Sequence, residues 1–138
     1  IDESVPERLY GGAQDNGTNR TLSGNPDAWA SIYGGDGFRC LVDPNDDRYI
    51  YAEYQYGNLA RSTNYGSSFT SATSGINSSD RKNWNTPVTF NPLNPNSLYY
   101  GANRLYKSIN KAVSWSAISD DLSNGAGSGN QKYGTITT

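Results

Sequence analysis

The chain has 138 residues, a formal net charge of −2 and no histidine, and 34 % of its residues are hydrophobic. Its length fits one small domain or part of a larger one, and it lacks the basic clusters that nucleic acid or an anionic membrane would need. The absence of histidine excludes a Ser-His-Asp triad and any His-containing zinc site within this chain. No metal site and no cofactor is expected, and no apolar run reaches the roughly 18 residues of a membrane span.

Aromatic residues are frequent, with 11 Tyr, 3 Trp and 3 Phe, and charged residues make up 17 % of the chain. This composition argues against disorder, which is typical of sequences with high charge and few aromatics. Cys40 is the only cysteine, so no internal disulfide is possible. Because it lies in the apolar run FRCLV, it is interpreted as a small core residue rather than a reactive thiol.

Short strands are expected throughout. Gly, Asn, Pro and Ser punctuate the chain roughly every ten residues, and the runs between them are rich in Tyr, Val, Ile and Thr. In chain order, the expected strands are 9–12, 17–21, 29–33, 38–42, 49–53, 59–62, 68–73, 86–90, 98–101, 105–108 and 115–119.

An internal repeat organises these strands. The stretch KSINKAVSW (107–115) aligns with RSTNYGSSF (61–69), and TFNPLNPNSLYYGA (89–102) aligns with LVDPNDDRYIYAE (41–53). The matched positions, 46 residues apart, are Ser62 with Ser108, Asn64 with Asn110, Gly66 with Ala112, and Phe69 with Trp115. Four strands in about 46 residues is the size of one propeller blade.

The repeat predicts an all-β fold of four-stranded antiparallel propeller blades. Residues 8–33 are expected to form a blade lacking its first strand, 36–73 and 84–119 two further blades, and 132–138 the first strand of a following blade. About three blades make an incomplete ring, because propellers close with roughly four to eight. We expect a piece of a longer propeller; the alternative is assembly with a second copy, two chains supplying six blades.

The pattern Ser-x-Asp/Asn-x-Gly-x-x-Trp/Phe resembles the Asp-box, or bacterial neuraminidase repeat, of sialidases, sortilin-like receptors and family-74 xyloglucanases. Here Asn64 and Asn110 stand where Asp is usual. The runs YGGAQDNGT, GGDGF and NWNTPVTFNPLNPNSLYYGANRLYKS are similar to secreted bacterial glycosyl hydrolase repeat proteins. The resemblance implies a secreted or cell-surface protein of bacterial type. It also implies that the box turns lie away from the active face, in a structural role.

Candidate site residues are therefore sought on the other face. The run GGAQDNGT offers Gln14, Asp15 and Asn16, although Asp-Asn-Gly is also an ordinary hairpin turn. Asp36 in GGDGF precedes an inner strand, where a carboxylate would lie at the mouth of the channel. Glu53 lies among tyrosines, where it could bind sugar hydroxyls or could be solvent-exposed.

Trp84 and the acidic run at 43–47 are also considered as binding residues. Trp84, at the position equivalent to Asp36, offers a platform for sugar rings or packs between blades. The acidic run DPNDD (43–47) lacks the spacing of an EF-hand and is interpreted as an Asp-Pro turn.

We expect a non-catalytic propeller module whose face binds a polysaccharide or a protein. The alternative is a fragment of a family-74-like glycoside hydrolase acting on xyloglucan or another polysaccharide. A glycoside hydrolase needs two carboxylates at a defined separation, and Asp15, Asp36 or Glu53 could supply one. A sialidase is disfavoured, because the three-arginine pattern of that family is not recognisable here.

Overall fold

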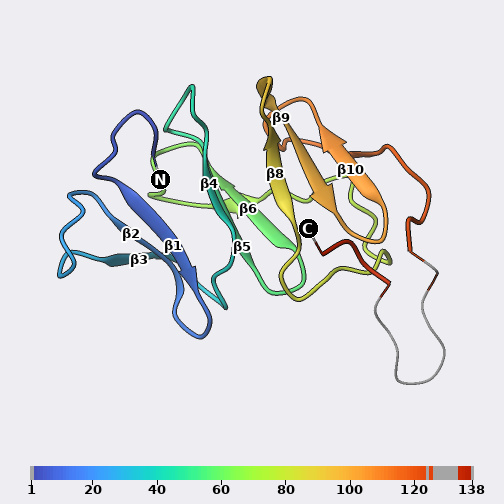
Figure 1. Cartoon of the computed structure of the whole chain (residues 1–138), viewed down its shortest axis with the longest axis horizontal. Helices are drawn as coiled ribbons and strands as arrows, with labels where there is room; N and C mark the ends of the chain where they lie inside the picture. Colours follow the sequence, from blue (N-terminus) through green and yellow to red (C-terminus); the bar gives the residue numbers. More distant parts are fainter. Residues whose placement is uncertain (1, 124, 126–133, 138) are drawn as a thin grey trace. The chain divides into compact units, whose positions relative to one another are not determined.

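The computed structural model describes residues 2–123, 125 and 134–137. Over these residues the chain forms eleven short strands (Figure 1). The strands pair into three antiparallel sheets, each made of strands that follow one another in the sequence. Within the described part of the chain, no helix is long and apolar enough to span a membrane.

The first sheet has three strands in the order β1 (Leu9–Ala13), β2 (Gly17–Thr21) and β3 (Ala30–Tyr33). The β1–β2 hairpin turns through Asp15, whose φ is 64°, and Gly17, whose φ is 68°. A Cβ added at Gly17 would lie 2.3 Å from the Tyr33 carbonyl oxygen, so only glycine fits there.

The second and third sheets each have four strands. The second contains β4 (Cys40–Val42), β5 (Ile50–Tyr54), β6 (Asn58–Ser62) and β7 (Thr70–Ser71) in that order. The third contains β8 (Val88–Asn91), β9 (Asn94–Gly101), β10 (Leu105–Ser108) and β11 (Ser116–Ala117). The all-β, meandering organisation expected from the sequence is therefore confirmed.

The expected strands are found with shifted ends. The largest shift is in β9, which begins at Asn94 because Asn91 pairs with Asn94 across a tight turn. Residues 134–137 do not form a strand: the Ile136 amide donates to the Ala102 carbonyl at 2.9 Å instead. Residues 132, 133 and 138 of the expected terminal strand lie outside the described residues, so that strand stays a prediction.

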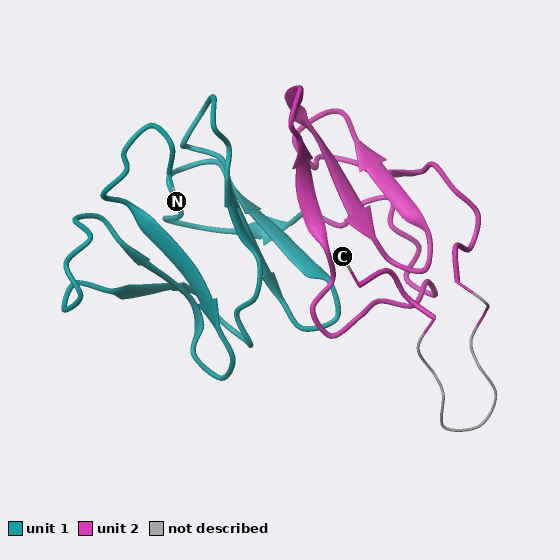
Figure 2. Cartoon of the chain, viewed as in Figure 1, with its two compact units in different colours: residues 1–72 teal, residues 73–138 magenta. Residues whose placement is uncertain are grey.

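The chain divides into two compact units, residues 1–72 and 73–138 (Figure 2). Buried core side chains of the first unit come mainly from the two central strands of the second sheet: Ile50, Tyr51, Ala52, Leu59 and Ala60. Those of the second unit include Val88, Leu98, Tyr100, Tyr106 and Trp115. Aromatic side chains thus supply much of the apolar burial in a sequence with few aliphatic residues.

A pair of an aromatic residue and a cationic residue occurs at the same register in each of the three sheets. It lies between the two strands of the β1–β2, β5–β6 and β9–β10 hairpins. The pairs are Tyr10 with Arg20, Tyr51 with Arg61, and Tyr99 with Lys107. In the third sheet the Lys107 ammonium lies 5.8 Å from the centroid of the Tyr99 ring, within cation–π range. This shared row makes the three sheets comparable residue by residue.

The turn between β6 and β7 is held by the Ser62 hydroxyl. Its oxygen accepts hydrogen bonds from the amides of Gly66 at 2.8 Å and Asn64 at 3.2 Å, and it donates to Asn64 Oδ1 at 2.9 Å. Asn64 Oδ1 also accepts from the Ser68 amide at 3.0 Å. We call residues 62–69 the first Ser–Asn turn.

The turn between β10 and β11, residues 108–115, repeats this network and is called the second Ser–Asn turn. The Ser108 hydroxyl accepts from the amides of Ala112 at 3.0 Å and Asn110 at 3.3 Å and donates to Asn110 Oδ1 at 2.9 Å. Ala112 has a φ of 57°, close to the 78° of Gly66. The second turn therefore keeps the left-handed geometry with a side chain that disfavours it.

In the first unit, the first Ser–Asn turn packs against the first sheet. The Arg20 guanidinium donates to the Tyr65 carbonyl, and the Tyr33 and Phe69 rings lie 5.0 Å apart between centroids. A Cβ added at Gly66 would lie 3.2 Å from Arg20 Nη1. Phe69 thus packs between neighbouring sheets.

Candidate binding site

Three loops meet at one end of the first unit, opposite the first Ser–Asn turn. They are the β1–β2 hairpin loop (14–16), the β3–β4 loop (34–39) and the β5–β6 hairpin loop (55–57), which together we call the hairpin end. The two hairpin loops occupy equivalent positions in their sheets, and the β3–β4 loop, which connects the sheets, makes contact with both. The Gly37 amide donates to the Ala13 carbonyl at 3.1 Å and joins two of the loops directly.

Asp36 connects all three loops. Its carboxylate Oδ1 accepts a hydrogen bond of 2.8 Å from the Asp15 amide, and its own amide donates to Gln55 Oε1 at 3.0 Å. The residue is only 8 % exposed, so these bonds form with little competition from water. Asp36 therefore holds the three loops together, with its carboxylate on the β1–β2 loop and its backbone amide on the β5–β6 loop.

Beside this network two tyrosines border an open pocket of about 200 Å³. Tyr33, Gly34, Gly35 and Tyr54 line it, and the two rings lie 5.8 Å apart between centroids. Gly35 has a φ of 78°, and a Cβ added there would lie 2.7 Å from the Tyr54 Cβ. Glycine thus keeps the floor of the pocket clear and allows the loop to turn.

Burial, together with the neighbouring Tyr54, raises the pKa of the Tyr33 hydroxyl. The hydroxyl therefore stays protonated at neutral pH and can donate a hydrogen bond. An aromatic wall with a few fixed polar groups is the usual lining of a small-molecule site.

The structure brings Asp15 and Asp36 into direct contact at this end of the unit. Gln14 and Asn16 lie exposed on the same hairpin, where the Asn16 side-chain amide donates to the Gln14 carbonyl at 3.1 Å. The hairpin interpretation of this run is confirmed, since residues 14–16 form the β1–β2 turn, and its binding role stays a prediction.

Glu53 and Trp84 are not part of the contact between Asp15 and Asp36. Glu53 lies on β5 and is 0 % exposed, so the solvent-exposed reading of this residue is wrong. Its backbone carbonyl accepts from the Phe38 amide at 3.2 Å. Trp84 belongs to the second unit and is 39 % exposed, which leaves part of its ring accessible there.

Sequence reasoning missed Gln55, Tyr54 and Gly35. Each lies within a stretch that also holds a predicted site residue, YAEYQYGN or GGDGF. The available signal was the repeat itself, because the β5–β6 hairpin loop is the structural counterpart of the β1–β2 loop that contains Asp15.

The acidic run at 43–47 forms a turn with hydrogen bonds and ion pairs of its own. Asp43 is buried and its Oδ1 accepts from the Asn45 amide at 2.9 Å, while Asp46 pairs with Arg48 at 2.7 Å. Arg8 pairs with Asp47 at 2.6 Å. These contacts support the Asp-Pro turn interpretation.

No protein-family profile and no curated protein matches the chain. Among solved structures, an ancestral GH74 enzyme is similar, with a TM-score of 0.67 and 22 % identity over 84 % of this chain and 17 % of that chain. A GH74 enzyme from Niastella koreensis gives a TM-score of 0.63 and 21 % identity over 88 % of this chain and 21 % of that chain.

These likenesses define the class of fold. The chain consists of β-propeller blades, about three of them, fewer than the roughly four to eight that close a ring. It spans about a fifth of the length of the GH74 chains that it matches. At such low identity the likeness concerns fold alone, so function has to be argued from the site.

Proposed function

We propose that this chain is a non-catalytic, glycoside-hydrolase-like propeller module of an exported protein and binds a polysaccharide chain at the hairpin end. The observation that carries the proposal is the pocket between Tyr33 and Tyr54, placed next to the Asp36–Gln55 hydrogen-bond network. Tyrosine rings present flat apolar faces to the C–H surfaces of a sugar. The amide and hydroxyl groups beside them suit the sugar hydroxyls.

The binding groups are held in place before a ligand arrives. Asp36 ties the three loops together, and the Gln55 carbonyl accepts from the Asn58 side chain at 2.6 Å. Loops fixed in this way lose little conformational entropy on binding. Accessible groups for ligand contact remain on Tyr54, Gln14 and Asp15.

The carboxylates support binding better than hydrolysis. A glycosidase needs one carboxylic acid and one carboxylate facing the scissile bond from opposite sides. Asp36 uses an oxygen to hold the β1–β2 loop, and Glu53 is fully buried. Asp15 is exposed and is the remaining candidate carboxylate at this end.

A second function remains in competition: a fragment of a hydrolase whose other carboxylate lies elsewhere in a longer protein. The likeness to GH74 enzymes favours it, since those chains are about five times longer than the part matched here. Because polysaccharides of this kind are extracellular polymers, both proposals imply an exported protein, in agreement with the resemblance to secreted bacterial repeat proteins.

The test is calorimetric titration of the 138-residue chain with xyloglucan oligosaccharides, cello-oligosaccharides and sialyllactose. Tyr54→Ala and Gly35→Ala should each weaken binding at least tenfold, because one removes a wall of the pocket and the other fills it. Tyr65→Ala, an exposed tyrosine of the first Ser–Asn turn, is the matched control and should bind normally. Binding that survives both pocket variants would contradict the proposed site.

Reducing-end release from the same oligosaccharides separates the two functions. The non-catalytic proposal predicts none above buffer. Turnover that disappears in both Asp15→Asn and Asp36→Asn would instead support the hydrolase fragment.

A further inference from the structure

The internal repeat shows how one blade packs against the next. In the first unit, the first sheet presents Tyr33 and Arg20 to the second sheet. Phe69 packs on Tyr33 at 5.0 Å, and the Arg20 guanidinium donates to the carbonyl of Tyr65, whose φ is 60°. Three features therefore define the contact: an apolar residue on the last strand, a cation on the strand beside it, and an aromatic on the incoming turn.

The third sheet carries the receiving features in the same register. Lys107 is the counterpart of Arg20, since each lies opposite a tyrosine in its sheet. Ile118 is the counterpart of Tyr33, because each lies opposite the residue two positions before the cation. The Ile118 amide donates to the carbonyl of Leu105 at 2.8 Å, two residues before Lys107. Tyr33 pairs with Thr18, two residues before Arg20. Ile118 is 50 % exposed.

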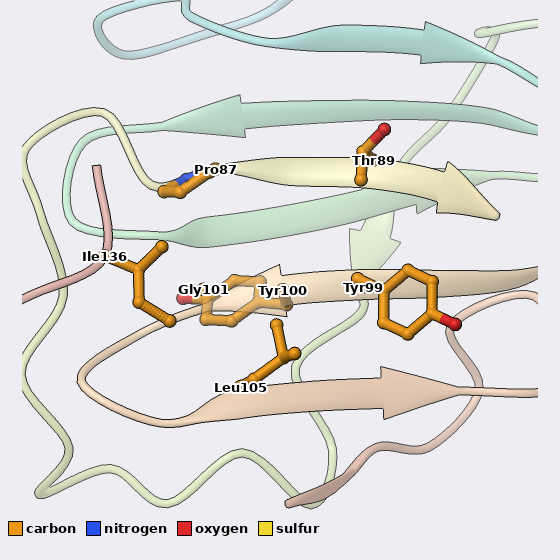
Figure 3. A pocket seen from close by; sticks show the side chains of 7 residues that line it. All are labelled: Pro87, Thr89, Tyr99, Tyr100, Gly101, Leu105 and Ile136. Carbon is orange, nitrogen blue, oxygen red and sulfur yellow. The ribbon is translucent and has the colours of Figure 1, made fainter. Parts of the chain in front are cut away.

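A hollow of about 90 Å³ lies over β8, β9 and β10 of the third sheet, and one of its lining residues, Tyr99, pairs with Lys107. Figure 3 shows the side chains that line it. Pro87, Thr89, Tyr99 and Leu105 line it, and Ile136 closes one end above Gly101. Residues 134–137 take the place that 34–37 take on the first sheet, since the Ile136 amide bonds the Ala102 carbonyl much as the Gly37 amide bonds that of Ala13. Residues 134–137 therefore bond to the third sheet as residues 34–37, which lead from the first sheet to the second, bond to the first sheet.

The first sheet carries the incoming features on its other face. Trp29 immediately precedes β3, as Phe69 precedes β7 and Trp115 precedes β11. Trp115 is 4 % exposed, whereas Trp29 is 44 % exposed. Gly24 has a φ of 68° and stands three residues after Thr21, as Tyr65 stands three residues after Ser62. Its carbonyl is the counterpart of the one that Arg20 binds.

We propose that these two faces bind each other between copies of this chain, head to tail. Trp29 of one copy packs on Ile118 of the next, and Lys107 of that copy donates to the Gly24 carbonyl. Two copies bring six sheets, which lies within the roughly four to eight blades of closed propellers. The contact is heterologous, because each copy contributes a different surface to it.

Light scattering after gel filtration tests the proposal on the 138-residue chain. The unmodified chain should have the mass of two copies, and Trp29→Asp and Ile118→Asp should each have the mass of one. Leu93→Asp, which replaces a leucine of the second unit that is 93 % exposed, is the control and should keep the mass of two. A single-copy mass for the unmodified chain at roughly 100 µM would overturn the proposal.

Mixing the two variants keeps the test decisive if either substitution disturbs folding. Each variant retains one intact face, so an equimolar mixture of Trp29→Asp and Ile118→Asp should form pairs that neither forms alone. An isologous dimer, or loss of assembly through misfolding, would give no such recovery. Failure of the mixture to associate would therefore refute the head-to-tail contact.

Discussion

Removing the Ser62 hydroxyl should destabilise the fold without touching the hairpin end. This oxygen makes three hydrogen bonds within the first Ser–Asn turn, and one of its donors, the Gly66 amide, is buried. About 1 kcal/mol for each of the two other bonds, and about 1–3 kcal/mol for the buried Gly66 amide left without a partner, gives a loss of roughly 3–5 kcal/mol for Ser62→Ala. That is a large part of the roughly 5–15 kcal/mol that stabilises a typical domain.

Urea unfolding followed by aromatic fluorescence measures this loss. With a slope of about 2 kcal/mol per molar urea, the midpoint should fall by roughly 1.5–2.5 M. Ser67→Ala, an exposed serine of the same turn, is the matched control and should shift the midpoint very little. Ser62→Thr keeps a hydroxyl, as Thr21 does at the corresponding place of the first sheet, and should recover most of the stability. A loss below about 0.5 kcal/mol for Ser62→Ala would refute the structural role of the turn.

Three further outcomes are expected. Gly66→Ala should cost about 1 kcal/mol in urea unfolding, since a φ of 78° disfavours a Cβ; an unchanged midpoint would contradict this. Burial raises the pKa of the half-buried Cys40 thiol to about 12, so its reaction with a disulfide reagent at pH 8 should be about a thousandfold slower than that of a free thiol; fast labelling of the folded chain would show an accessible thiolate. The Ser123 hydroxyl and the Arg81 guanidinium hold the pKa of Asp121 well below its usual range. The stability that this carboxylate contributes is complete above about pH 4, its ordinary pKa, and is lost as the pH falls toward the lower folded value. Asp121→Asn should therefore remove part of the acid-induced loss of stability, and identical pH profiles from pH 2 to 7 would contradict that.

The repeated parts of the molecule could be predicted from sequence because they depend on local chemistry. Ser62 and Ser108 hold their turns through bonds to residues two and four positions away, so a 46-residue echo in the sequence suffices to identify them. The strands follow from the same punctuation by Gly, Asn, Pro and Ser. The fold class is therefore predictable from the order of the residues alone.

The pocket could not be predicted in full because it depends on contacts between distant segments. The rings of Tyr33 and Tyr54 come together only when the first and second sheets pack. The requirement for glycine at position 35 depends in part on the position of Tyr54, whose Cβ would lie 2.7 Å from an added Cβ. The burial of Glu53 could not be predicted either. The alternation along YAEY does not reveal that both faces of β5 are covered, so the sequence left open whether this glutamate is buried or exposed.

Amide chemical shifts recorded during titration with a xyloglucan oligosaccharide would show where on the chain a glycan binds. The shifted signals should belong to the hairpin end, with Asp15, Gly35, Asp36 and Gln55 among them, and the signals of both Ser–Asn turns should stay unchanged. Shifts confined to residues 62–69 and 108–115, or no shifts with any glycan of the panel, would contradict the proposed site.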